Sequence, residues 1–211
     1  MYQNIPTKVL TGEVRLSYAN LTAPRAQQGG DPKYSVTLLI PKTDVATYQD
    51  IVQSIEAAAQ DAQGKLWNCI RPPVLPQPLH DGDGVRENGT PFGPECKGHW
   101  VMTASTKNRP QVVHQSNINA ELAPQDIYSG MYARVTVNFF GYSNAGRKGV
   151  GCGLGNVMKT RDGEPLAGGA SAESDFAGIG ATAAPGYPQQ PAYGGAPVGP
   201  AAINPLTGQP L

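Results

Sequence analysis

One segment constrains the fold more than any other. From Met131 to Tyr142, small or aliphatic residues alternate with polar or aromatic ones. Neighbouring side chains of a strand point to opposite faces, so Ala133, Val135, Val137 and Phe139 form one apolar face. The opposite face carries Tyr132, Arg134, Thr136, Asn138, Phe140 and Tyr142. A long strand with one apolar face needs neighbouring strands and a core beneath it, which predicts a protein built mainly of β-structure.

Four further strands are predicted, at residues 13–21, 33–41, 99–105 and 150–158. In the first of them, Val14, Leu16 and Tyr18 alternate with polar neighbours, so we expect Tyr18 on the apolar face. The last strand has glycine at every second position, from Gly149 to Gly155. Alternating glycines indicate a bend or a close approach of other groups to the backbone.

A single helix is predicted after the second strand. Thr43 or Asp44 can cap its start, Val45, Tyr48, Val52, Ile55 and Ala59 recur at helical spacing, and Gly64 is placed to cap its end. Residues 70–94 are rich in proline and glycine and predict a loop. About five strands, one helix and long connections favour a small Greek-key β-barrel over a parallel α/β sheet.

The composition changes sharply near residue 166. Residues 177–211 contain seven Gly and seven Pro, and no Asp, Glu, Lys or Arg. Such a segment cannot bury enough apolar surface to offset the entropy lost on ordering. The sequence therefore predicts one folded domain over residues 1–166, followed by a disordered tail over 167–211, acidic at first and then Pro/Gly-rich.

The charge is unevenly distributed although the formal net charge is zero. Residues 97–161 hold eight basic residues against Glu121 and Asp126, whereas residues 162–175 hold four acids and no base. A basic stretch of this kind fits a polyanionic partner, and also fits an ordinary solvated surface. Three cysteines, no signal peptide at Met1 and no apolar run of ~18 residues predict a cytoplasmic protein with reduced thiols and no membrane partner.

The polar face of residues 131–142 interleaves aromatic rings with a base, as in proteins that bind single-stranded nucleic acid. The alternative is a strand buried on both faces, with Tyr and Phe in the core. Basic turns at residues 107–110 and 143–149, and the pair Lys33 and Tyr34, complete the candidate interface. The predicted DNA-binding residues are Lys33, Tyr34, Trp100, Lys107, Arg109, Tyr132, Arg134, Phe140, Tyr142, Arg147 and Lys148.

No catalytic residue, metal site or cofactor is predicted. Cys96 and His99 have ligand-like spacing, but a structural zinc site needs a second close pair. The run Asp81-Gly-Asp-Gly84 lacks the later ligands of a calcium loop and predicts a turn. Two alternatives stay open: a metal-dependent nuclease using Asp81, Asp83, Glu87 and Glu95, and a scaffolding or interaction protein.

Several long motifs, in this order, resemble a phage family once described as a domain of unknown function and now as single-stranded-DNA-binding. They are Thr11–Leu21, Lys33–Lys42, Asp81–Asp83, Ile127–Val135, Val137–Phe140, Lys148–Leu154, Arg161–Leu166 and Ser171–Phe176. The resemblance spans about residues 7–176. It implies an OB-fold that coats single strands during phage replication or recombination, without reading sequence and without catalysis.

The tail differs from the ends of related single-strand binders, which often carry an acidic peptide tipped with Phe. Here the chain ends in neutral Pro/Gly sequence, so residues Glu173–Phe176 are the candidate docking segment for phage replication or recombination proteins. Tyr187 and Tyr193 are candidates for weak self-association.

Overall fold

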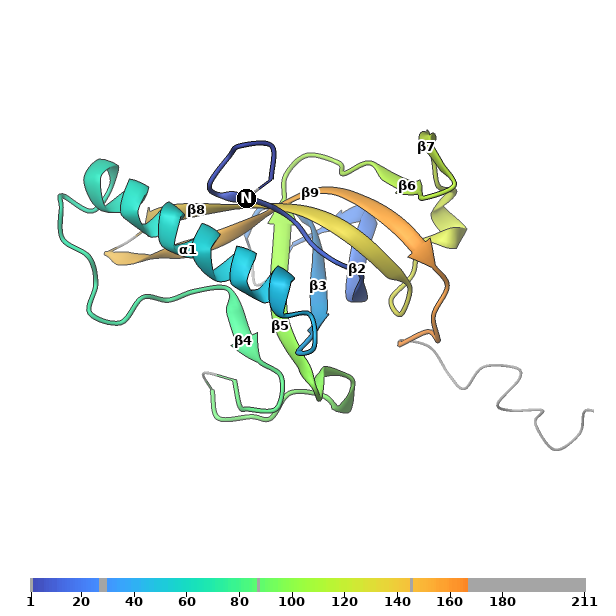
Figure 1. The fold of residues 1–211 in the computed structure, drawn as a ribbon, viewed down its shortest axis with the longest axis horizontal. Coiled ribbons are helices and arrows are strands. Elements are labelled where there is room, and N and C mark those ends of the chain that lie inside the picture. Colours follow the sequence, from blue (N-terminus) through green and yellow to red (C-terminus); the bar gives the residue numbers. More distant parts are fainter. Residues whose placement is uncertain (1, 27–29, 87, 145, 167–211) are drawn as a thin grey trace, which may run out of the picture. The chain divides into compact units, whose positions relative to one another are not determined.

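Five strands pair in a closed cycle (Figure 1). The computed structural model describes residues 2–26, 30–86, 88–144 and 146–166. The cycle runs through β8 (Tyr132–Asn144), β2 (Val14–Arg25), β3 (Lys33–Pro41), β5 (His99–Thr106) and β9 (Arg147–Arg161), and β8 pairs with β9 to close it. All these pairings are antiparallel except the one between β5 and β9. A five-stranded barrel of this kind confirms the predicted OB-fold class.

Shorter elements extend the barrel and were absent from the prediction. They are β1 (Lys8–Leu10) beside β8, β4 (Leu79–Asp81) beside β5, β6 (Val112–His114) beside β9, β7 (Asn117–Glu121) beside β6, and two 3-10 turns, η1 (Pro94–Cys96) and η2 (Pro124–Asp126). Each of these strands has only three to five residues. A run that short offers too few positions for an alternating pattern to be recognised.

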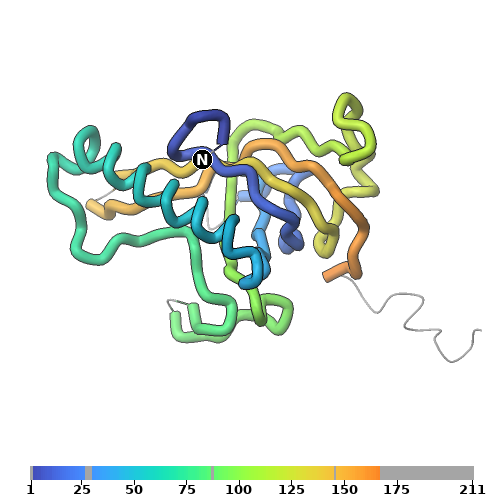
Figure 2. The backbone as a smooth tube through the Cα atoms, in the orientation of Figure 1, coloured from blue at the N-terminus to red at the C-terminus, as the bar shows by residue number. Residues whose placement is uncertain are grey.

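The apolar face predicted for β8 is the centre of the core. Ala133, Val135, Val137 and Phe139 are all at most 1% exposed, so the predicted alternation is confirmed. Helix α1 (Val45–Lys65) crosses the hairpin formed by β8 and β9 (Figures 1 and 2). Its buried face consists of Thr47, Ile51, Ser54, Ile55, Ala58, Ala59 and Ala62.

The helix begins where the sequence predicted and ends slightly later. The Asp44 side chain accepts a hydrogen bond from the Thr47 backbone N–H at 3.0 Å, which confirms Asp44 as the N-terminal cap. Gly64 lies inside the helix, and Leu66 follows its last residue, so the prediction of Gly64 as the C-terminal cap was wrong. The Leu66 N–H still reaches the Ala62 carbonyl at 2.8 Å, so the chain stays helical past the glycine.

Two contacts fix the helix against β8. A Cβ atom placed on Gly141 would overlap the Cβ of Ala62, so only glycine lets the two backbones approach this closely. Just beyond the helix, the fully buried Trp67 donates its indole N–H to the Tyr142 carbonyl at 3.0 Å. The part of the β8–β9 hairpin near Gly141 and Tyr142 is therefore packed against the C-terminal end of α1.

Tyr18 does not lie on the apolar face of β2, contrary to the sequence-based prediction. Its backbone has φ +48°, and the pairing of β2 with β3 shifts register between Ser17 and Asn20. A bulge of this kind turns a side chain to the other face of the strand. The ring is consequently 65% exposed, and Leu21 returns to the core after the bulge.

The alternating glycines of β9 do mark close approach, as predicted. A Cβ on Gly151 would lie 2.9 Å from the Cζ atom of Phe140, and one on Gly155 would overlap the Thr136 hydroxyl. Side chains of β8 therefore lie across the backbone of β9. The predicted tail, including Glu173–Phe176, falls outside the described residues. No helix among the described residues is long and apolar enough to cross a membrane.

Candidate nucleic-acid interface

The outer face of β2, β3 and β5 carries a floor of small polar side chains. Successive residues of a strand face opposite ways, so Val36 and Leu38 enter the core while Ser35 and Thr37 face outward. The Thr37 and Thr103 hydroxyls lie 3.1 Å apart, and the Asn20 amide donates to the Ser35 hydroxyl at 3.3 Å. This floor offers both donors and acceptors.

One side of the floor is walled by β4 and by the described residues that follow it, 82–86 and 88–98. Cys96 packs with Leu39 and Val101, and Phe92 covers this small apolar cluster. The space between wall and floor is a groove of about 880 Å³. Its lining consists of Ser17, Tyr18, Asn20, Ser35, Thr37, Pro78, His80, Arg86, Asn88, Phe92, Glu95, Cys96, Val101 and Thr103.

Rings and one guanidinium gather on the wall side of this groove. The ring centroids of His80 and Phe92 are 6.3 Å apart, and the Arg86 guanidinium lies 5.2 Å from the Phe92 centroid. Tyr18 joins the lining from β2. Flat π-systems suit stacking on unpaired bases, and a guanidinium can contact phosphate. Glu95 is the one carboxylate among the described lining residues.

A salt-bridge clamp holds the start of the wall. The Lys42 ammonium contacts Asp81 at 2.5 Å and Asp83 at 2.6 Å, and Asp83 also accepts the Gly98 N–H at 2.9 Å. The hydrogen bond from Lys42 is the main cause that lowers the pKa of both carboxyl groups, and the Asp81 carboxylate in turn raises the pKa of Lys42. The two ends of residues 82–98 are thereby tied together.

The polar face of β8 points away from the core, as predicted, but its members differ in their surroundings. Tyr132 lies between two guanidiniums, with Arg161 at 3.4 Å and Arg15 at 5.8 Å from its ring centroid. Arg134 is exposed, and Phe140 is 48% exposed. The Tyr142 hydroxyl lies against Gly149 and its ring is half-buried. Among the predicted DNA-binding residues of this strand, Arg134 and Phe140 are thus the exposed ones.

At the free end of the hairpin, the two predicted basic residues have different roles. Arg147 is exposed. Lys148 donates to the carbonyls of Trp67 at 3.1 Å and Ile70 at 3.4 Å, just beyond the end of α1. Its ammonium is therefore engaged by backbone oxygens of the protein.

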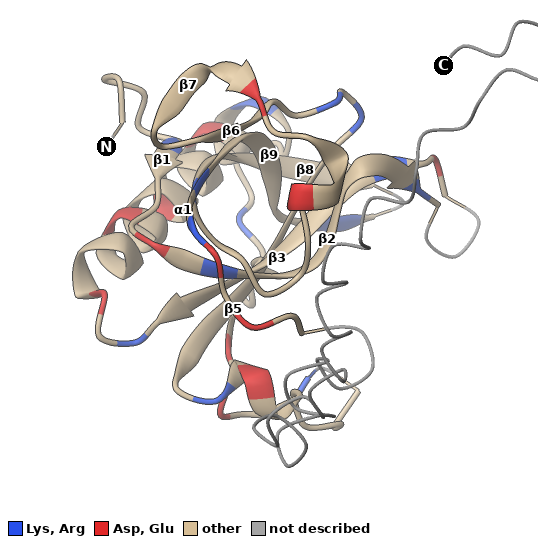
Figure 3. Cartoon of the chain, turned by 90° about the vertical axis from the view of Figure 1, so that its right-hand side faces the viewer, with Lys and Arg blue, Asp and Glu red and all other residues tan. Residues whose placement is uncertain are grey.

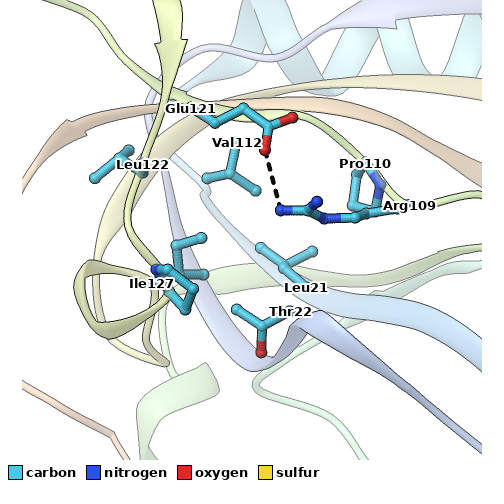
Figure 4. Close-up of a pocket in the computed structure, with 9 residues that line it drawn as sticks. Leu21, Thr22, Arg109, Pro110, Val112, Glu121, Leu122 and Ile127 are labelled. Atoms are coloured by element: carbon cyan, nitrogen blue, oxygen red, sulfur yellow. Dashed lines mark hydrogen bonds and ion pairs between the residues drawn. The ribbon is translucent and has the colours of Figure 1, made fainter.

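Two of the predicted cations near the opposite end of the barrel are ion-paired. Lys107 contacts Asp31, and Arg109 contacts Glu121 at 3.0 Å. Figure 4 shows the latter pair above a pocket of only about 40 Å³, too small for a nucleotide. The backbone of Tyr34 pairs with Thr106, which brings Lys33 and Tyr34 close to Lys107.

Trp100 lies apart from the other predicted DNA-binding residues. Its ring stacks on Tyr48 of α1 with the centroids 4.6 Å apart, and it packs against the core. The Lys42 ammonium lies 5.0 Å from the Trp100 centroid, which links this stack to the clamp.

The structure therefore distributes the eleven predicted residues over several places and adds a groove that the sequence did not reveal. Tyr18 was missed because a one-residue bulge reverses its direction. Phe92, His80 and Arg86 were missed because they lie in or beside an irregular loop, where no periodicity shows which way a side chain points. Their one signal in the sequence was that a His, an Arg and a Phe fall within the short range 80–92, although three acids stand there too.

The groups considered for metal binding do not assemble in the described part of the chain. Among these residues, no three His, Cys, Asp or Glu side chains are grouped so that they could hold an ion. Asp81 and Asp83 are instead occupied by Lys42. Basic and acidic positions are interspersed over the surface (Figure 3), so local arrangement matters more than net charge.

Comparisons with known proteins agree with the fold and with a nucleic-acid interface. The family model described as Enterobacter phage Enc34, ssDNA-binding protein, matches residues 7–185. A putative protein p50 from Acyrthosiphon pisum secondary endosymbiont phage 1 is 33% identical over 174 residues, covering 77% of this chain and 88% of that protein.

Two solved structures are similar in fold. The single-stranded DNA-binding protein from bacteriophage Enc34, in complex with ssDNA, has a TM-score of 0.64 and 29% identity, over 76% of this chain and 90% of that one. The gp2.5 single-stranded DNA binding protein of bacteriophage T7 has a TM-score of 0.52 and 17% identity, over 77% and 96% of the two chains. Since the family model spans most of the sequence, the chain belongs to the family of the Enterobacter phage Enc34 ssDNA-binding protein.

Proposed function

We propose that this protein coats and protects single-stranded DNA, without reading its sequence, along the groove on the outer face of β2, β3 and β5. The setting is phage DNA replication or recombination in the cytoplasm of the host cell. Residues 1–166 are the binding domain, and residues 167–211 are a tail with Glu173–Phe176 as its docking segment. Family membership supports the ligand, because a relative of similar fold was solved in complex with ssDNA.

The observation that carries the choice of groove is the bulge at Tyr18. A non-glycine residue with positive φ is uncommon, and for a bulky residue it is strained. In this chain the strained backbone turns a large ring out of the core and into a groove with a polar floor. The fold thus gives up the burial of the Tyr18 ring and bears a strained backbone at this residue. A cost of this kind supports a binding role for the ring.

The groove also fits binding without sequence preference. Stacking rings accept every base, because every base has a π-face, and Arg86 can follow the phosphates. Serine, threonine and asparagine on the floor can either donate or accept hydrogen bonds. Catalysis is not proposed, because Asp81 and Asp83, two of the carboxylates considered for a nuclease, are held by Lys42, and the family is one of ssDNA-binding proteins.

The deciding experiment compares Tyr18→Asn with Tyr18→Phe in a fluorescence polarisation titration with a labelled oligonucleotide of about 30 bases. Asparagine tolerates positive φ better than tyrosine, so Tyr18→Asn should fold at least as stably as the wild type. It lacks the ring, so its affinity should fall by about 1–3 kcal/mol. Tyr18→Phe keeps the ring and should bind like the wild type.

Val52→Ala, on the exposed face of α1, is a matched control for removing an apolar side chain far from the groove. Each variant should be titrated with single-stranded and duplex DNA at two salt concentrations. If Tyr18→Asn binds single strands as tightly as the wild type does, the groove is not the binding site. If the wild type binds no single-stranded DNA, the proposed function itself is wrong.

A further inference from the structure

We propose that the bound strand leaves the groove, crosses β9 and stacks a base on Phe140 of β8, which makes Phe140 a second binding site. This inference rests on the proposed function. The most exposed large ring of the described residues is Tyr18 in the groove, and Phe140 is the next, at 48% exposed. Tyr18 lies on β2 and Phe140 on β8; these strands pair directly at residues 14–15 of β2, and in the other direction round the cycle they are joined through β3, β5 and β9.

Strand register places the groove floor and Phe140 on one continuous face. Thr103 and Ser105 belong to the outward face of β5, and Ser105 pairs with Gly153 of β9. Gly153 in turn pairs with Asn138 of β8, two residues from Phe140. Paired residues point to the same side of a sheet. The outer face therefore runs without a break from β5 to β8.

The distance is short enough for one strand of nucleic acid. Neighbouring strands lie about 4.8 Å apart, so two steps from β5 to β8 span roughly 10 Å. That span is comparable to about three stacked nucleotides at ~3.4 Å each. A ligand in the groove can reach Phe140 within one OB-fold site, which takes about 4–16 nucleotides.

The glycines of β9 set the position of the ring. Ideal Cβ atoms on Gly151 and Gly153 would lie 2.9 Å and 3.7 Å from atoms of the Phe140 ring, so the ring spans both backbone positions. With its inner side on the strand, the ring leaves its other side to solvent. An aromatic ring supported from one side in this way is suited to stacking.

Charge on this face favours a polyanion over a protein partner. Strands β1, β5, β8 and β9 contain no Asp or Glu. They do carry Lys8, which pairs with Asn138 on the edge of β8 that faces away from β9, and the exposed Arg134 and Arg147. Lys8 makes no ion pair with any described residue; its ammonium is bonded to Gln3 at 2.8 Å. Phosphates flanking a base on Phe140 would find cations on both sides.

The test measures affinity against ligand length. Wild type and Phe140→Ala are titrated with oligothymidylates of about 4 and about 30 nucleotides. Held in the groove at Tyr18, the shorter ligand cannot span the four strand spacings of ~4.8 Å from β2 to β8, whereas the longer one fills the whole site. The expected result is a roughly tenfold loss for the long ligand, as for one stacked base, and less than a twofold change for the short one. Tyr18→Asn should lower the affinity for both ligands. If it does not, the proposed groove is wrong, and that result is distinguishable from a failure of the proposal for Phe140.

A second variant covers the case in which Phe140→Ala alters folding. Phe140→Trp keeps a stacking ring and should retain affinity for the long ligand. The emission that this variant gains over the wild type should be quenched by the long ligand and not by the short one. No loss with Phe140→Ala, an equal loss at both lengths, or added emission that the long ligand leaves unquenched each overturns the proposal. A change in sedimentation coefficient without a change in affinity would show a protein contact instead, and would overturn it as well.

Discussion

The guanidinium of Arg161 lies 3.4 Å from the ring centroid of Tyr132, and Arg15 approaches the same ring at 5.8 Å. Glu13 accepts a hydrogen bond from Arg161 at 3.0 Å and another from Thr160 at 2.7 Å. These contacts connect the start of β2 to the first residue of β8 and the last residues of β9. Tyr132, predicted from the sequence as a stacking residue for DNA, is in this structure engaged by the protein's own cations.

We therefore expect Tyr132→Leu to act on stability rather than on binding. Loss of the ring between two guanidiniums should lower the midpoint of thermal denaturation by roughly 2–4 °C, the shift typical of a contact worth about 1 kcal/mol in a domain of this size. Affinity for single-stranded DNA, measured well below that midpoint, should change less than twofold. A large loss of affinity with an unchanged midpoint would place Tyr132 in the interface.

The clamp formed by Lys42 with Asp81 and Asp83 predicts a pH dependence of the groove wall. The folded protein lowers the pKa of both carboxyl groups, so their stabilising effect is complete above the ordinary pKa of aspartate. It is lost as pH falls through the lowered values, below about pH 4. The raised pKa of Lys42 means that the same contact is lost only in strong alkali.

Hydrogen exchange of residues 82–98 at pH 3 and pH 6 checks this prediction. We expect faster exchange at pH 3, after correction for the intrinsic rate, while β8 keeps its protection. Lys42→Met should show the fast exchange at both pH values and weaken DNA binding. Equal protection of the loop in the variant and in the wild type would mean that the clamp does not hold the wall.

Two glycine-to-alanine substitutions should have opposite effects. A Cβ on Gly141 would overlap Ala62, so Gly141→Ala should push α1 away from β8 and destabilise the fold by about 1–3 kcal/mol. Gly64 lies in the helix with nothing within 4 Å of its Cβ position, so Gly64→Ala should stabilise by about 0.5–1 kcal/mol. Urea denaturation followed by circular dichroism measures both, and a stable Gly141→Ala protein would contradict the close packing.

How far the sequence predicted this structure depended on the length of each pattern. β3 begins and ends at the predicted residues, and β8 differs by one or two, because a run of nine to twelve residues is long enough to identify a strand, and in β8 the alternation also identifies the buried face. β6 and β7 have three and five residues, too few to show an apolar face, so nothing in their sequence distinguished them from loops. The pairing of β6 depends on β9, which is distant in the chain.

The candidate site was less predictable, for a physical reason that Tyr18 illustrates. Alternation predicts direction only while every residue has extended backbone angles, and a single positive φ at Tyr18 reverses it. Lys148 shows a second limit: the sequence places it in a basic turn, but the carbonyls that it contacts belong to residues 67 and 70. Contacts between distant parts of the chain decide whether a cation is free for DNA.

The three cysteines should differ in reactivity. Cys69 is exposed, whereas Cys96 and Cys152 are buried, and burial raises the pKa of both buried thiols. Thiolates are the reactive form, so a thiol reagent at pH 7–8 should label one cysteine in the native protein and three after unfolding. Mass spectrometry of peptides identifies the site, and rapid native labelling of Cys152 would mean that the β8–β9 region opens readily.

Arg147 and Lys148 are neighbours in sequence but should give different phenotypes. Arg147 is exposed, so if it contacts a phosphate, Arg147→Ala reduces the salt dependence of binding, lowering the slope of log K against log salt by about 0.7. Lys148 is bonded to backbone carbonyls beyond α1, so Lys148→Ala should destabilise the fold by about 1 kcal/mol and leave the slope nearly unchanged. Titrations at four salt concentrations and urea denaturation separate the two effects. An unchanged slope for Arg147→Ala removes the hairpin tip from the path of the DNA, whereas a reduced slope for Lys148→Ala would mean that its ammonium leaves the helix end to bind phosphate.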